Sequence, residues 1–74
     1  RPMTPHHVNV FFVDPRNGWV ATLLTVEDYQ IGEGSYSYLK TDAIGNAKSI
    51  AKRHGLPVHI FGKNGLEQRV AQCG

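Results

Sequence analysis

The sequence predicts a single α+β domain: a mostly antiparallel sheet of four or five strands with one helix packed on one face. Three observations support this prediction. Five short segments are rich in β-branched and aromatic residues, and turn-forming residues separate them. One segment, ending near residue 54, carries apolar side chains at helical spacing. The chain has 74 residues, which suffices for one small core and not for two.

Residues 7–13 and 18–25 predict the first two strands, joined as a hairpin. Both segments are dense in Val, Phe, Leu and Thr, the residue types enriched in strands. The turn between them contains a proline and an Asn-Gly dipeptide, which supplies the positive φ angles of tight connections. Residues 1–6, with prolines at positions 2 and 5, predict a flexible tail.

Residues 26–34 are expected to form a polar loop, since they contain two acidic residues and two glycines. Residues 35–39 alternate serine and tyrosine and predict a short third strand with Tyr36 and Tyr38 on one face. A short strand with one polar face suits the edge of a sheet.

Thr41 or Asp42 is expected to cap a helix that runs to about His54, because either side chain can accept from the free N–H groups of the first turn. Gly55 and Pro57 then end the helix. The apolar face of this helix is predicted to comprise Ile44, Ala47, Ile50, Ala51 and His54.

Residues 58–61 and 66–71 predict a last hairpin around a second Asn-Gly turn. In its second strand we expect Leu66 and Val70 on one face and Glu67 and Arg69 on the other. The order of elements is therefore β-β-β-α-β-β. Short turns make neighbouring strands antiparallel, and the helical crossing permits one parallel pair.

Both faces of the first hairpin are apolar, yet one helix covers only one face of a sheet. The uncovered set is predicted to be Phe11, Val13, Val20 and Leu24 if the helix covers Val10, Phe12, Trp19 and Ala21. The pattern does not say which face the helix takes. The remaining face packs under the loop and the tail, against a second copy or another protein, or against stacked nucleic-acid bases. We expect a protein interface, so the first function hypothesis is an interaction module that self-associates or binds another protein.

A nucleic-acid-binding accessory protein is the alternative function. The formal net charge is +2, which is small for a dedicated DNA-binding domain. Several basic side chains lie along the predicted helix and near it. The candidate contacts to phosphate are Lys40, Lys48, Lys52, Arg53, Lys63 and Arg69. An ordinary solvated helix face would account for the same residues.

Three segments together resemble a known family. They are the strand, turn and Gly-Trp of residues 10–20, the alanine-bearing helix of residues 40–55 and the Gly-x-x-Gly hairpin of residues 58–66. Their order and spacing are similar to the small bacterial family catalogued as domain of unknown function 2188. The resemblance covers most of residues 8–70. It implies a fold and a bacterial or phage setting, and it implies no reaction.

No set of side chains has the spacing of a catalytic or metal site, so we expect no enzyme, no metal and no cofactor. The possible metal ligands are His6, His7, His54, His59 and Cys73. Adjacent His6 and His7 would point to opposite faces of a strand, and structural zinc sites show paired ligands at short spacing. The acidic pair at residues 27–28 is expected to be solvated.

Cys73 is the only cysteine and sits next to the C-terminus, so no intrachain disulfide forms and an incidental thiol is expected. No apolar run is long enough for a membrane span, and no signal peptide is evident. We expect a cytoplasmic protein whose natural chain begins at Met3.

Overall fold

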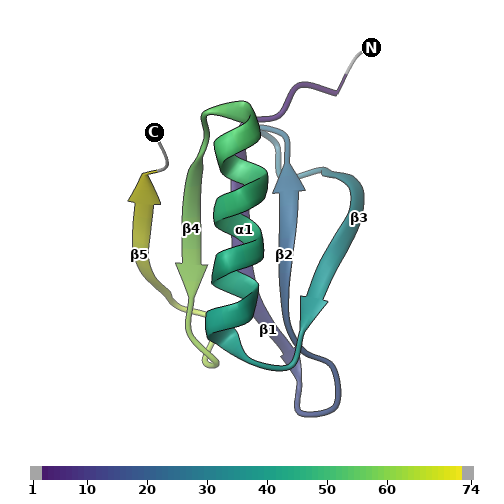
Figure 1. Ribbon diagram of the computed structural model, residues 1–74, viewed down its shortest axis with the longest axis vertical. Helices are drawn as coiled ribbons and strands as arrows, with labels where there is room; N and C mark the ends of the chain where they lie inside the picture. Colours follow the sequence, from purple (N-terminus) through teal and green to yellow (C-terminus); the bar gives the residue numbers. More distant parts are fainter. Residues whose placement is uncertain (1–2, 73–74) are drawn as a thin grey trace.

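The computed structural model describes residues 3–72 and confirms the α+β fold, with five strands and one helix (Figure 1). The elements are β1 His7–Asp14, β2 Gly18–Leu24, β3 Gln30–Ser37, α1 Lys40–His54, β4 Pro57–Phe61 and β5 Glu67–Gln72. The strand order in the sheet is β3-β2-β1-β4-β5, so β1 is the central strand. The predictions for Cys73 and for the residues before Met3 fall outside the described residues.

The sheet is mostly antiparallel, as predicted, with one parallel pair. Both hairpins, β1–β2 and β4–β5, are antiparallel, and so is β2–β3. The parallel pair joins β1 to β4, with Val8 beside Val58 and Val10 beside Ile60. It arises because α1 carries the chain from the edge strand β3 across the sheet to the far side of β1.

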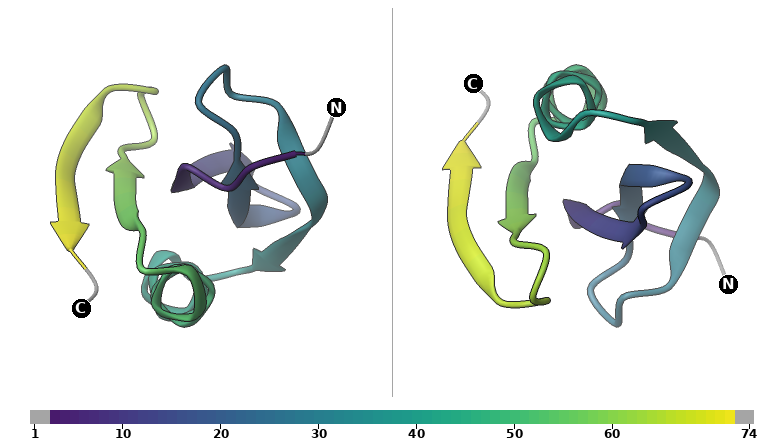
Figure 2. Two further views of the ribbon diagram at one scale, coloured as in Figure 1. Left: turned by 90° about the horizontal axis from the view of Figure 1, so that it is seen from above. Right: turned by 90° about the horizontal axis from the view of Figure 1, so that it is seen from below.

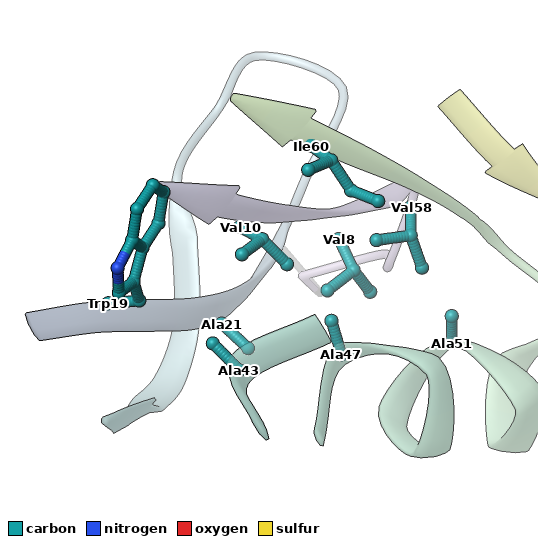
Figure 3. Close-up of a cluster of buried hydrophobic side chains, with 9 residues drawn as sticks. All are labelled: Val8, Val10, Trp19, Ala21, Ala43, Ala47, Ala51, Val58 and Ile60. Carbon is teal, nitrogen blue, oxygen red and sulfur yellow. The ribbon is translucent and has the colours of Figure 1, made fainter. Parts of the chain in front are cut away.

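The core lies between α1 and one face of the sheet. Ala43, Ala47 and Ala51 of α1 are fully buried, and their small side chains let the helix axis approach the strands closely. Opposite them lie side chains of β1, β2 and β4 (Figure 3). The buried strand residues of this cluster are Val8, Val10, Trp19, Ala21, Val58 and Ile60. The helix therefore covers the face that contains Val10, Trp19 and Ala21, with Phe12 partly buried beside them.

The helix differs from its prediction in its N-cap and in the exposure of His54. Leu39, and not Thr41 or Asp42, is the N-cap, and no side chain caps the first turn. The backbone N–H of Ala43 donates to the Leu39 carbonyl, so the chain enters the helix earlier than expected. The buried face of the helix consists of Ala43, Ala47 and Ala51 and ends at Ala51. His54, in the last turn, is therefore exposed. The C-terminal stop at Gly55, which has φ 68°, is as predicted.

The third strand begins five residues before the predicted start. Residues 30–34, expected in a loop, belong to the strand: Gln30 lies opposite Leu24 and Ile31 opposite Leu23, and residues 32–34 form an irregularity before Ser35 pairs with Ala21. An edge strand needs backbone pairing on one side only, so a polar, glycine-containing segment forms it without apolar alternation. Tyr38 lies beyond the strand, so Tyr36 and Tyr38 do not share a strand face.

The last strand contains an irregularity that changes the side of the sheet to which its first side chain points. Phe61 pairs with Glu67, whereas Ile60 pairs with Arg69, which leaves Gln68 as an extra residue. Glu67 lies on the same side of the sheet as Val70, because their partners Phe61 and His59 share that side. The predicted division, with Val70 and Glu67 on opposite faces, is wrong for this reason.

The β1–β2 turn is stabilised by the carboxylate of Asp14. It accepts hydrogen bonds from the Asn17 side-chain amide at 2.9 Å, the Asn17 N–H at 2.7 Å and the Arg16 N–H at 2.9 Å. These bonds, led by the Asn17 amide, lower the pKa of Asp14 below its ordinary value. A carboxyl group with a lowered pKa stabilises the fold above its unfolded-state pKa, and this contribution disappears as the pH falls through the folded-state pKa.

Replacing Asp14 should therefore destabilise the hairpin in a pH-dependent way. Asp14→Ala should lower the Tm at pH 7, and the difference from wild type should shrink as the solution is acidified below the folded-state pKa. Thermal unfolding followed by circular dichroism between pH 7 and pH 2 measures this. Asp14→Asn keeps an acceptor oxygen without ionising, so wild type should approach it at low pH. A Tm difference that is constant across this range contradicts the role assigned to the charge.

Candidate binding surface

The residues that alternate with the core residues point away from α1 and form a second face of the sheet, here called the open face. The open face consists of His7, Asn9 and Phe11 of β1, Val20, Thr22 and Leu24 of β2, His59 and Phe61 of β4, and Val70 of β5. Val13 follows at the end of β1 as the extra residue of an irregularity between Phe12 and Asp14. Seen along the long axis of the molecule, α1 lies on the other side of the sheet (Figure 2). Within residues 3–72, α1 is the one helix, so no helix of that part of the chain covers the open face.

Only half of the predicted interface is accessible. Phe11 and Val13 are 38% and 39% exposed, in line with an uncovered face. Val20 and Leu24 are 2% and 7% exposed, so the prediction that they form a contact surface is wrong.

The reason is that neighbouring strands bury both side chains. Val20 sits between its cross-strand partners Phe11 and Tyr36. Gly34 also lies against it, since a Cβ built on Gly34 would come within 2.7 Å of the Val20 side chain. Leu24 lies opposite His7, at the start of the connection to β3. The loop interpretation thus holds for one end of the open face.

A histidine network closes that same end. The His7 Nε2 donates to the Asp28 carboxylate at 2.8 Å, and His7 is 8% exposed. Because the carboxylate only accepts, neutral His7 carries its proton on Nε2 and its Nδ1 accepts from His6 Nδ1–H at 2.9 Å. His59 meets the His7 ring edge-on, with centroids 5.1 Å apart. The Asp28 residue that forms this bond has φ 69°, so its backbone lies in the left-handed region.

Two expectations about these histidines need correction. His6 and His7 do not point to opposite faces, because His6 precedes the strand and its ring contacts that of His7. Asp28 is not merely solvated, since it binds His7. No group of three or more His, Cys, Asp or Glu among residues 3–72 has the geometry to hold a metal ion. The network therefore joins β1 to the β2–β3 connection, while His59 joins β4 to β5 through Glu67 at 2.7 Å.

The middle of the open face contains two buried polar atoms without partners. The Asn9 Oδ1 and the Thr22 Oγ1 are buried and accept or donate no hydrogen bond within the described part of the chain. Asn9 and Thr22 lie opposite each other on the two central strands. An unpaired buried polar group costs about 1–3 kcal/mol, so such groups are rare without a function or a bound molecule. Sequence reasoning missed Asn9, although it is a lone amide within an apolar strand.

A hollow of about 300 Å3 adjoins Asn9 and the 62–65 turn, and this turn follows β4 at the lower end of the sheet in Figure 1. It opens beyond the last pair of β1 with β4, Val10 beside Ile60, where β4 turns away from β1. Its lining consists of Asn9, Phe11, Phe12, Phe61, Lys63 and the two glycines of the 62–65 turn. The turn is held by a hydrogen bond from Gly62 N–H to the Leu66 carbonyl at 2.9 Å and from Gly65 N–H to the Gly62 carbonyl at 3.0 Å.

The basic residues predicted to contact nucleic acid come from α1, from β5 and from the turn between β4 and β5. Lys48, Lys52 and Arg53 are exposed on α1, whereas Arg69 is exposed on β5 opposite Ile60. Lys40 and Lys63 instead flank an aromatic pair.

This aromatic pair consists of Phe12 and Trp19, whose ring centroids are 5.3 Å apart. The Lys40 Nζ lies 4.9 Å from the Trp19 ring, and the Lys63 Nζ lies 5.0 Å from the Phe12 ring. Lys40 also donates to the Gln68 side chain. The fold thereby brings two cations from distant parts of the chain to the end of the sheet at which the hollow opens.

In comparisons with known proteins, no family model, curated protein or solved structure matches the chain. The resemblance to domain of unknown function 2188 therefore stays a prediction. Among residues 3–72, no helix has both the length and the apolar character needed to cross a membrane.

Proposed function

We propose that this chain is a small, non-enzymatic interaction module that self-associates through the open face. The observation that supports this proposal is the accessible part of the open face and its end at Val13, where Phe11, Val13 and Val70 are 38%, 39% and 43% exposed. Burying such side chains against a partner is favourable by about 25 cal/mol per Å2 of apolar area. An aromatic ring near the middle of a contact is also the usual kind of residue that dominates binding energy.

The charges on the open face favour a second copy as the partner. The two carboxylates beside it each have a hydrogen-bond partner within the chain, Asp28 with His7 at 2.8 Å and Glu67 with His59 at 2.7 Å. Two such faces can therefore approach each other without leaving either carboxylate bare of hydrogen bonds, which would cost free energy at an interface. The outer face of α1, with Lys48, Lys52 and Arg53, would repel its own copy instead.

Phe11→Asp should abolish self-association without unfolding the chain. The introduced carboxylate would have to lose its water at the interface, and removal of a central aromatic residue weakens a complex by about 30-fold or more. Sedimentation velocity at tens of micromolar should show wild type as a dimer and the variant as a monomer. Circular dichroism should show the fold intact, since Phe11 is partly exposed in the single chain.

Tyr38→Asp is the matched control, because Tyr38 is 74% exposed and lies outside the sheet. It should dimerise like wild type. Val70→Asp gives a second test on the open face in case Phe11→Asp fails to fold. A wild type that stays monomeric at all concentrations, or variants of Phe11 and Val70 that dimerise normally, would refute the proposal.

A further inference from the structure

We propose that the hollow between β1, β4 and the 62–65 turn binds a nucleotide unit, with its base against Phe61 and Phe11 and its phosphate at Lys63. Phe11 also belongs to the proposed self-association surface, so a nucleotide and a second copy would compete for it, and nucleotide binding itself needs only the single chain. The nucleotide is either free or part of a single strand, because both present the same base and phosphate.

The first support is the pair of aromatic side chains on adjacent parallel strands. Phe11 and Phe61 directly follow Val10 and Ile60, the last paired residues of β1 and β4, and both line the hollow. Phe11 is 38% exposed, which leaves its ring available for contact. Phenylalanine rings on a sheet surface are a common platform for unpaired bases, because every base has a π face that stacks.

The second support is the amide of Asn9 at the inner end of the hollow. Its Oδ1 is buried without a partner in the described part of the chain. Rotation of the carboxamide exchanges its oxygen and nitrogen, so it presents a donor and an acceptor side by side. The edge of a base offers the complementary arrangement, and adenine is the base that an asparagine amide matches in a bidentate manner. Once the carboxamide turns toward the hollow, a ligand of this kind would pair a group that the single chain leaves without a partner.

The third support is the cation at the rim. The Lys63 ammonium lies 5.0 Å from the Phe12 ring, a residue that also lines the hollow, and forms no ion pair with a carboxylate within residues 3–72. The adjoining turn is fixed by its own hydrogen bonds, so the backbone from which the Lys63 side chain extends is held beside the hollow. An aromatic ligand with an anionic group matches this combination better than a neutral aromatic side chain of a protein does. The volume of about 300 Å3 lies at the lower end of small-molecule sites.

The test is a titration of 15N-labelled protein, followed by NMR, with AMP, with a single strand of eight deoxyadenosines and with a duplex. We expect AMP and the single strand to shift the Asn9 side-chain amide and the backbone amides of Gly62, Lys63 and Gly65. Tighter binding of the strand would identify single-stranded nucleic acid as the source, and equal binding would identify the free nucleotide. Both results support the site, and the duplex should bind more weakly because its bases are stacked.

Matched variants separate this site from other surfaces. Phe61→Leu keeps apolar volume without a ring and should weaken binding by about 5- to 150-fold, the loss typical of one stacking residue. Lys63→Glu should weaken it further and make the remaining binding less dependent on salt. Lys52→Glu makes the same charge change on the outer face of α1 and should leave AMP binding unchanged. Thermal unfolding checks that each variant is folded.

Several outcomes would overturn the proposal. They are no shifts with AMP or the strand, shifts confined to α1 around Lys52, or binding that Lys63→Glu leaves unchanged. Shifts produced by N-acetyl-tyrosine amide but not by AMP would mean that the hollow takes a protein side chain. Val70 lies outside the hollow, so Val70→Asp should remove self-association and keep AMP binding, whereas Lys63→Glu should do the reverse. The two proposals therefore fail independently.

Discussion

Gly18→Ala should destabilise the domain by about 2–5 kcal/mol. Gly18 has φ 77°, and an alanine in the left-handed region costs roughly 1–2 kcal/mol. The added Cβ would also lie 2.5 Å from the Ser37 carbonyl oxygen and 2.7 Å from the Tyr38 Cα. Both are backbone atoms, so the end of β3 would have to move away from β2, and overpacking of this kind costs about 1–3 kcal/mol more. Thermal unfolding should show a Tm lower by at least about 10 °C.

Gly32→Ala is the control that separates the steric clash from backbone strain. Gly32 has nearly the same φ, 72°, but no atom lies within 4 Å of the position where a Cβ would be placed. It should therefore show only the strain of about 1–2 kcal/mol. If both variants lose the same stability, close packing of the chain over Gly18 plays no part.

Ala47→Leu should destabilise the domain by about 3 kcal/mol, the upper end of the range for overpacked cores. Ala47 is fully buried at the middle of α1, and it faces the sheet between Ala43 and Ala51 (Figure 3). Three further carbon atoms at this position would push the helix off the strands and open gaps beside the neighbouring alanines. Chemical denaturation should show a lower midpoint with an unchanged slope.

Ser49→Leu introduces the same side chain on the exposed side of α1 and serves as the control. It should leave stability nearly unchanged, because surface substitutions usually fall within about 0.5 kcal/mol. A stable Ala47→Leu variant would show that the alanine stripe does not set the distance between helix and sheet.

Most of the fold was predictable, because local signals define most of its elements. The Asn-Gly turns, the β-branched segments and the Gly55 stop each act over a few residues, and the structure has the corresponding hairpins and helix end. The errors occur where local signals are weak. Residues 30–34 lack apolar alternation, yet they belong to β3, whose backbone pairs with β2 at residues 30–31 and again from residue 35. The extra residue Gln68 in β5 has no marker in the sequence.

The candidate sites were less predictable, because they depend on residues far apart in the chain. Phe11 and Val13 were identified from the two-sided apolar hairpin and are exposed. The burial of Val20 and Leu24 depends on β3 and the β2–β3 connection, which the pattern of β2 cannot reveal. The hollow likewise needs Asn9 and Lys63 together, and these residues meet only because β4 pairs with β1.

The sequence by itself determined the class and order of the elements, the turns and the presence of one more apolar sheet face than one helix can cover. Only the tertiary structure decided which face that is, because both faces of the first hairpin are apolar. With β1 and β4 parallel neighbours, the connection between them crosses in the right-handed sense seen in Figure 1. The handedness of this connection places α1 over the sheet face that contains Val10 and Ala21. Asn9 and Phe11 therefore lie on the opposite face.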